Sequence, residues 1–236
     1  MRTSDVDEML ATLYLRLNGY FTTGLIVHSP EHGRALAEVD SLAIRHPYHT
    51  QSERDVDISE FLLIEGEVAD LVLCEVKSDP THICFNAPIK TDMAVREAIV
   101  AWSGLFQPNQ TADAVNAIET LVTGKLAVQE RKAGLVIGGC RIRALLVCPS
   151  RQEPMEDEWC LRGADLMAYV VKCLNPIERR PSCSVRYNFS QWGFPLSHII
   201  RYVKDQTAGR SVEVNEIYQL FGVETVALHA PATLHD

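Results

Sequence analysis

An apolar stretch at residues 70–76 constrains the fold of this chain more than any other part, because it predicts a buried strand that ends in charged residues. There Glu75 and Lys77 are separated only by Val76. Side chains alternate between the two faces of a strand, so Glu75 and Lys77 are expected on one face. Charges inside a central strand are costly unless something pairs with them or uses them. The stretch therefore predicts a functional site or, as the simpler alternative, a surface ion pair at a strand end.

Two more acids lie in the strand pair predicted before this stretch. Residues 20–29 and 34–45 are typical of the two strands of a hairpin, joined by a turn at residues 30–33. The second strand carries Glu38 and Asp40 within an otherwise apolar segment, and the period of two puts both on one face. Asp40 is the stronger candidate because apolar residues flank it on both sides. Glu38 is either a spare acid or an ordinary solvated residue.

The N-terminal segment predicts a helix over residues 4–18. Ser4 and Asp7 have the spacing of a capping box, and Gly19 favours an end after residue 18. Glu8 lies away from the clearest apolar stripe, on a face with small residues that would let it approach a neighbouring element. The alternative is that Glu8 is favoured there only by the helix dipole. The apolar stripe consists of Val6, Leu10, Leu13 and Leu17.

The remaining elements predict one large α/β unit with a mostly helical end. A polar connection at residues 47–67 precedes the Glu75 strand. After that strand come helices at residues 92–106 and 111–132, a strand pair or one broken strand at residues 135–148, and helices at residues 163–174, 196–204 and 212–221. We therefore expect a core at residues 1–150 and a C-terminal extension at residues 151–236 that packs on it.

This order of elements and acids resembles the PD-(D/E)xK superfamily of metal-dependent nucleases, which includes many restriction endonucleases. Glu75-Val76-Lys77 matches the (D/E)xK motif, Asp40 matches the upstream acid, and Glu8 matches the acid that many members carry on the first helix. The resemblance covers about residues 5–150. It implies a restriction-endonuclease-like αβββαβ core with a mixed central sheet flanked by helices, followed here by a C-terminal helical lobe.

The resemblance also implies a catalytic site that holds Mg²⁺ or Mn²⁺. Asp40 and Glu75 would supply carboxylate ligands and Val76 its carbonyl oxygen, since Mg²⁺ prefers hard oxygen ligands. Lys77 would position the attacking water and stabilise developing charge, and Glu8 would help to bind a second metal ion or a water. The expected substrate is a phosphodiester in nucleic acid, DNA in preference to RNA, because most members act on DNA. A homodimer or larger assembly is expected by the same analogy.

Candidate contacts to nucleic acid come from two basic segments. Arg141 and Arg143 alternate with apolar residues on the strand expected beside the Glu75 strand, so they could face a phosphate. Arg179, Arg180 and Arg186 lie in a segment that mixes cations with aromatic residues, which suits phosphate contacts and base stacking. The alternative for the second segment is a basic loop that leads into core aromatic residues.

Net charge, cysteine content and a few local patterns limit the classes of protein and of site that this chain can represent. The net charge of −9 argues against a protein that binds nucleic acid through bulk charge, but not against a nuclease with a local basic surface. Seven cysteines without a Cys-x-x-Cys pair indicate reduced core residues. The acidic N-terminus and the absence of a long apolar run favour a cytoplasmic protein. His46 and His49 have the spacing of a metal pair, but loop histidines are more often solvated.

Two alternatives to a nuclease stay open at this stage. The first is a non-catalytic interaction protein that keeps the nuclease-like fold, which the acidic net charge favours. The second is an unrelated α/β protein in which the Glu-x-Lys pattern occurs by chance. Opposite faces for the Asp40 and Glu75 side chains would favour that second alternative.

Overall fold

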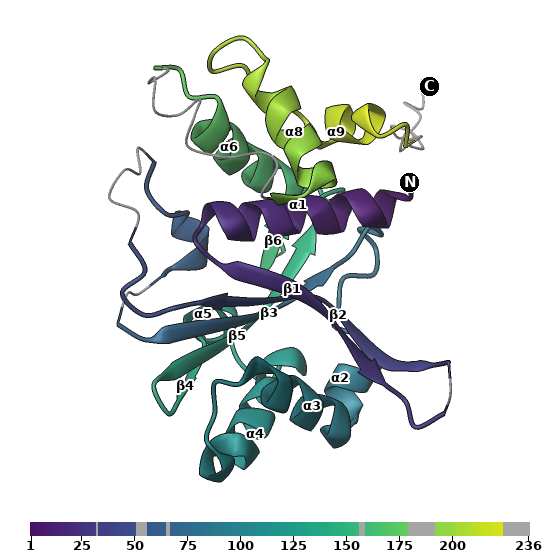
Figure 1. The fold of residues 1–236 in the computed structure, drawn as a ribbon, viewed down its shortest axis with the longest axis vertical. Coiled ribbons are helices and arrows are strands. Elements are labelled where there is room, and N and C mark those ends of the chain that lie inside the picture. The colour runs from purple at the N-terminus through teal and green to yellow at the C-terminus, as the bar shows by residue number, and fades with distance from the viewer. Residues whose placement is uncertain (32, 51–55, 65–66, 156–158, 179–191, 224–236) are drawn as a thin grey trace, which may run out of the picture.

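The chain forms one mixed, open β-sheet with helices on both faces (Figure 1). The computed structural model describes residues 1–31, 33–50, 56–64, 67–155, 159–178 and 192–223. The strands are β1 (Phe21–His28), β2 (Ala35–Arg45), β3 (Ala69–Val76), β4 (Leu135–Ile137), β5 (Cys140–Cys148) and β6 (Cys160–Arg162). The helices are α1 (Thr3–Leu17), α2 (Ala87–Thr91), α3 (Met93–Ser103), α4 (Thr111–Val122), α5 (Val128–Ala133), α6 (Gly163–Leu174), α8 (Phe194–Lys204) and α9 (Val214–Leu220). The predicted mixed α/β class is confirmed.

The sheet combines an antiparallel part with a parallel part. Its order is β1-β2-β3-β5-β4, and β6 also pairs with β5. β1 and β3 both run antiparallel to β2, whereas β5 runs parallel to β3. A parallel neighbour needs a long crossover, and the chain makes it through α2, α3, α4 and α5. The strand that carries Glu75 is therefore central, with β2 on one side and β5 on the other.

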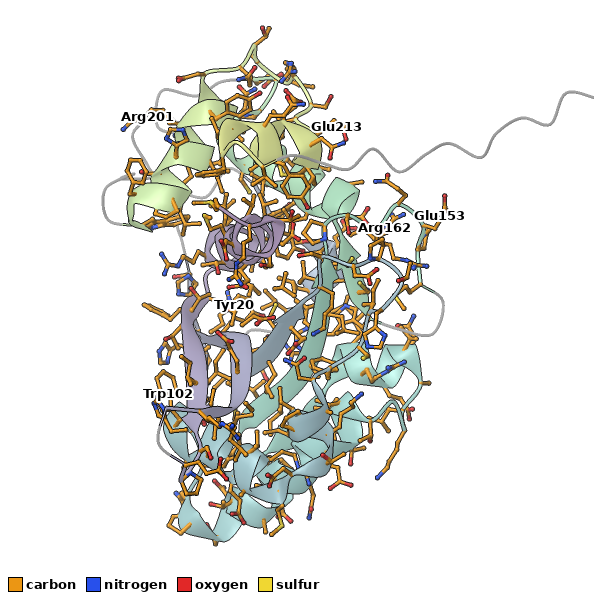
Figure 2. All side chains as sticks on the ribbon, turned by 90° about the vertical axis from the view of Figure 1, so that its right-hand side faces the viewer. Tyr20, Trp102, Glu153, Arg162, Arg201 and Glu213 are labelled. Atoms are coloured by element: carbon orange, nitrogen blue, oxygen red, sulfur yellow. The ribbon has the colours of Figure 1, made fainter. Side chains whose placement is uncertain are left out.

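Each face of the sheet has its own apolar cluster. Val72 and Cys74 of β3 pack in the cluster that includes α1, α6, α8 and α9. Leu71 and Leu73 pack in the cluster on the other face, which includes α3 and α4. This alternation is the period of two that the sequence predicts for the strand. In Figures 1 and 2, α1 lies between the sheet and the C-terminal helices, so it is covered on both sides.

The first helix has the predicted length, but its start differs from the prediction. The residue before the helix is Arg2, and its backbone amide donates to Asp5 Oδ2 at 2.8 Å. The predicted capping box of Ser4 and Asp7 is therefore wrong, since Ser4 already lies within the helix and the buried Asp7 carboxylate accepts from the Ser78 hydroxyl instead. The four residues of the predicted apolar stripe are all buried.

Other helix and strand boundaries differ from the predicted ones at positions where the chain turns. The helix predicted over residues 111–132 is two helices, α4 and α5, and Gly124 lies between them with φ +70°. The segment at residues 135–148 is a strand pair, with Gly138 and Gly139 at positive φ in the turn. The short β6 and α2 were not expected. None of the described helices is both long and apolar enough to cross a membrane.

Candidate functional site

Glu75 and Lys77 meet at the end of β3. The Lys77 ammonium lies 2.6 Å from Glu75 Oε1 and donates to Asn86 Oδ1 at 3.0 Å. The Glu75 side chain is only 2% exposed and that of Lys77 is 20% exposed. The Lys77 amide donates to the Val147 carbonyl oxygen at 2.8 Å, which ties this residue to β5. The pair is therefore a partly buried ion pair whose glutamate is almost excluded from water, not a surface ion pair.

Asp40 approaches the same strand end from β2. The register pairs Ser41 with Cys74, so one further step along the antiparallel strands brings Asp40 beside Glu75. Asp40 Oδ2 accepts a hydrogen bond from the Val76 amide at 2.6 Å. The long connection between β2 and β3 thus leaves the two acids on neighbouring strands.

A β-bulge in β2 explains how the Asp40 side chain reaches β3. Thr23 pairs with Leu42 and Leu25 pairs with Val39, so two steps along β1 correspond to three along β2. Val39 and Leu42 both pack on the face covered by α3 and α4, and Asp40 lies between them. A bulge interrupts the regular alternation and redirects a side chain, and bulges are frequent beside active sites.

Burial and mutual repulsion disturb the ionisation of both acids. Burial, followed by the negative charge of Asp40, raises the pKa of Glu75 to about 7, although the hydrogen bond and charge of Lys77 act to lower it. Burial also raises the pKa of Asp40, while the Val76 amide and Lys77 lower it. Glu75 Oε2 is buried and has no hydrogen-bond partner among the described residues. An unpartnered buried oxygen is expensive, so this atom suits a cation ligand.

Glu8 belongs to the same group of charges from the side of α1. It is half-buried, and burial, followed by the charges of Asp40 and Glu38, raises its pKa to about 7. Glu38 is exposed on β2. We refer to Glu8, Asp40, Glu75 and Lys77 as the acid–lysine site. Lys77 acts on the charges of Asp40 and Glu75, and Asp40 acts on that of Glu8. Carboxyl groups with perturbed pKa values that lie near one another and a lysine are typical of functional sites.

The donor chemistry of the acid–lysine site fits Mg²⁺ in part. Within the described residues, no set of three or more histidine, cysteine, aspartate or glutamate side chains is arranged to hold a metal ion. Mg²⁺ is usually held by one or two carboxylates, with water and substrate oxygens as further ligands. Asp40 and Glu75 meet that need. The Val76 carbonyl oxygen as a third ligand stays a prediction.

The expected phosphate contacts of Arg141 and Arg143 are wrong. Both side chains are buried against the Asp70 carboxylate, at 3% and 0% exposure. Arg143 Nε donates to Asp70 Oδ1 at 3.0 Å, and the Tyr20 hydroxyl donates to Asp70 Oδ2 at 2.5 Å. The guanidinium of Arg143 also lies over the Trp159 ring, 5.1 Å from its centroid. β5 is covered on both faces, so these alternating arginines face the protein interior.

The two histidine candidates lie away from the acid–lysine site. Arg179, Arg180 and Arg186 fall outside the described residues. His46 is exposed and packs edge-on against Phe21, with 5.5 Å between the ring centroids. His49 lines a cavity of about 370 Å³. The cavity is formed by Arg16, Gly19, Tyr20, Phe21, Thr22, His49 and Trp192. It contains none of the acids of the acid–lysine site.

Three polar residues near Lys77 were missed by the sequence reading. Asn86 precedes α2 and accepts from the Lys77 ammonium; an Asn two residues before a proline is a helix-start signal that could have identified α2. Asp7 and Ser78 form a hydrogen bond of 2.5 Å between α1 and the loop after β3. The local pattern marks Asp7 only as a helix cap, because its actual partners are remote in the sequence.

No protein-family model, curated protein or solved structure matches this chain. The candidate site therefore rests on its own residues and geometry.

Proposed function

We propose that this protein is a metal-dependent nuclease with a restriction-endonuclease-like core that hydrolyses phosphodiester bonds, in DNA in preference to RNA. One observation carries the proposal. At the end of a central strand, a buried glutamate is paired with Lys77, and the carboxylate of Asp40 reaches the same strand end from the neighbouring strand. This is the combination of acid, acid and lysine that the superfamily uses.

The topology supports the proposal. The order α1, β1, β2, β3, crossover helices, β5 corresponds to the αβββαβ order of that core, and β5 runs parallel to β3 as a crossover requires. The bulge at Asp40 and the central place of β3 bring both acids to one end of the sheet. A chance Glu-x-Lys pattern would not require the upstream acid to lie there.

The chemistry assigns a separate task to each side chain. Asp40 and Glu75 would hold the cation, and Glu75 Oε2, which has no hydrogen-bond partner among the described residues, would be available to it. The contribution of Mg²⁺ or Mn²⁺ is positive charge beside the phosphate oxygens that become more negative in the transition state. Lys77 orients the attacking water and adds a second positive charge. Asn86 fixes the Lys77 ammonium through the bond to its Oδ1.

The alternative is an interaction protein that retains this fold without activity. Its specific support is that the described residues contain no set of three metal-binding side chains. The net charge of −9 points the same way, because it limits the attraction of bulk nucleic acid.

Cleavage assays decide between the two. Plasmid, single-stranded DNA, branched DNA and RNA are incubated with the protein in Mg²⁺ or Mn²⁺, with and without a chelator. We expect cleavage that the chelator abolishes, and a loss of at least about 100-fold in Asp40→Asn and Lys77→Ala. In Asp40→Asn the side-chain carbonyl oxygen can still accept from the Val76 amide, so this variant tests the charge with little change in packing.

Glu97→Gln serves as the matched control, because Glu97 is an exposed acid on α3. Its cleavage rate should equal that of the wild type. Unchanged activity in both Asp40→Asn and Lys77→Ala would contradict the assignment of the site. A wild type that cleaves none of the substrates would favour the interaction protein.

A further inference from the structure

The buried carboxylate of Asp7 joins three distant parts of the chain. Asp7 lies in α1 with 0% exposure. Its Oδ2 accepts from the Ser78 hydroxyl and its Oδ1 accepts from the Tyr218 hydroxyl, both at 2.5 Å. Ser78 follows β3, and Tyr218 lies in α9, which is the last described helix. One carboxylate thus connects the C-terminal helices to the loop that begins at the acid–lysine site.

The backbone of Lys77 and Ser78 is held by hydrogen bonds from several elements. Ser78 is bonded to Lys77, so any shift of Ser78 moves the lysine. The Ser78 carbonyl oxygen accepts from the Ser150 hydroxyl at 2.8 Å, and the Lys77 amide donates to the Val147 carbonyl oxygen at 2.8 Å. Asp7 supplies the contact from the α1 side. Together these bonds leave the Lys77 backbone little freedom.

A purely structural role does not account well for this arrangement. A buried carboxyl group is expensive even when it is hydrogen-bonded, and apolar residues in its place are often neutral or stabilising. Tyr218 is 3% exposed and belongs to the same apolar cluster as Val6 and Leu10, so the surroundings would accommodate an apolar contact. Instead the Tyr218 hydroxyl, the Asp7 carboxylate and the Ser78 hydroxyl form a hydrogen-bonded chain that ends at the residue next to Lys77. Buried polar networks of this kind select one arrangement of the groups that they connect.

We propose that Asp7 is a positioning residue, through which Tyr218 of α9 sets the placement of Lys77. The C-terminal helices then help to position a residue of the active site. The catalytic consequence rests on the proposed function, whereas the link from Tyr218 to Lys77 is a property of the fold. The two are tested by different measurements.

Tyr218→Phe is the test variant, because it removes one hydroxyl and keeps the ring. Tyr202→Phe is the matched control, since the Tyr202 hydroxyl also donates to a carboxylate, Glu216 Oε2 at 2.9 Å, but within the C-terminal helices alone. Exchange of the Lys77 amide with solvent is measured by NMR in both. The Leu146 amide, which donates to the Trp159 carbonyl oxygen, reports general destabilisation.

We expect exchange at Lys77 to accelerate about tenfold relative to Leu146 in Tyr218→Phe, and less than about twofold in Tyr202→Phe. Equal acceleration at both amides, or equal effects in both variants, would overturn the proposed link. In cleavage assays kcat should fall about tenfold with KM within about twofold, because the lysine is misplaced while substrate contacts remain. Ser78→Ala should give the same pattern, and the double variant should be no worse than either single variant.

An inactive wild type would contradict the proposed function but not the link, which the exchange measurement decides alone. An active wild type with unchanged kcat in Tyr218→Phe would refute the positioning role while leaving the nuclease assignment intact.

Discussion

Glu75 shows how the site is built at the scale of one residue. Its carboxyl group is nearly excluded from water, with Oε1 paired to Lys77 and Oε2 without a hydrogen-bond partner among the described residues. A protein selected only for stability would not keep such a group. The disturbed ionisation of Glu75 therefore supports a role in binding a cation, at a cost in stability that a neutral side chain would relieve.

Glu75→Gln should stabilise the metal-free protein at high pH. The folded pKa of Glu75 is raised from 4.5 to about 7, so the folded state binds the proton more tightly than the unfolded state. The free energy of unfolding attributable to this group therefore falls as pH rises from about 4.5 to about 7, and the loss persists above that range. At pH 8 the variant should be about 1–3 kcal/mol more stable than the wild type, and at pH 4 the two should be equal.

Urea unfolding in the presence of a chelator measures this difference at both pH values. The same variant should lose nuclease activity. A Glu75→Gln protein that is less stable at pH 8 would mean that Lys77 already compensates fully for the buried charge.

At the scale of elements, the Asp70 carboxylate joins β3 to β5. It accepts from Arg141 and Arg143, and these arginines also donate to the carbonyl oxygens of Leu63 and Leu62. The network therefore holds the connection before β3 as well as two central strands. It lies on the face of the sheet that α1 covers and stabilises the end of β3 opposite to Glu75.

Asp70→Asn should destabilise the protein by about 3–5 kcal/mol, because it leaves two buried guanidinium groups without a counter-charge. Asp165→Asn is the control, since the Arg162–Asp165 pair at 2.7 Å is exposed and should contribute less than about 1 kcal/mol. Chemical denaturation compares the two. Equal effects would show that the Asp70 network is not the main tie between β3 and β5.

At the scale of the whole molecule, the C-terminal helices cover α1. Eight of its 15 residues are buried, because the sheet lies on one side and α6, α8 and α9 on the other. β6 adds to the same sheet by pairing with β5. The expected division at residue 150 stays a prediction, but the two parts share one apolar cluster.

A fragment of residues 1–150 should therefore fail to fold cooperatively. It would expose the apolar face of α1 and leave Asp7 without Tyr218. Thermal unfolding followed by circular dichroism, together with binding of a hydrophobic dye, tests this expectation. A sharp transition near that of the full chain would instead establish an independent core.

Local patterns predicted much of this protein. The periods of 2 and 3.6 located α1, the hairpin of β1 and β2, and the buried strand β3, because they depend on neighbours within a few residues. The same alternation led to the meeting of Glu75 and Lys77, which are two residues apart. Asp40 was recognised because an acid inside an apolar strand is unusual wherever that strand lies in the fold.

Only the tertiary structure decided the partners that lie far apart in the chain. Arg143 resembles a surface residue of an alternating strand. Its guanidinium group is nevertheless buried, because it pairs with Asp70, which lies 73 residues earlier. Asp7 has the position of a helix cap, yet its partner Tyr218 is 211 residues away. Such pairings depend on how strands and helices are stacked, and side-chain periodicity carries no information about that stacking. The sequence alone thus determined the elements and the acids, and the packing decided which charges remain available for chemistry.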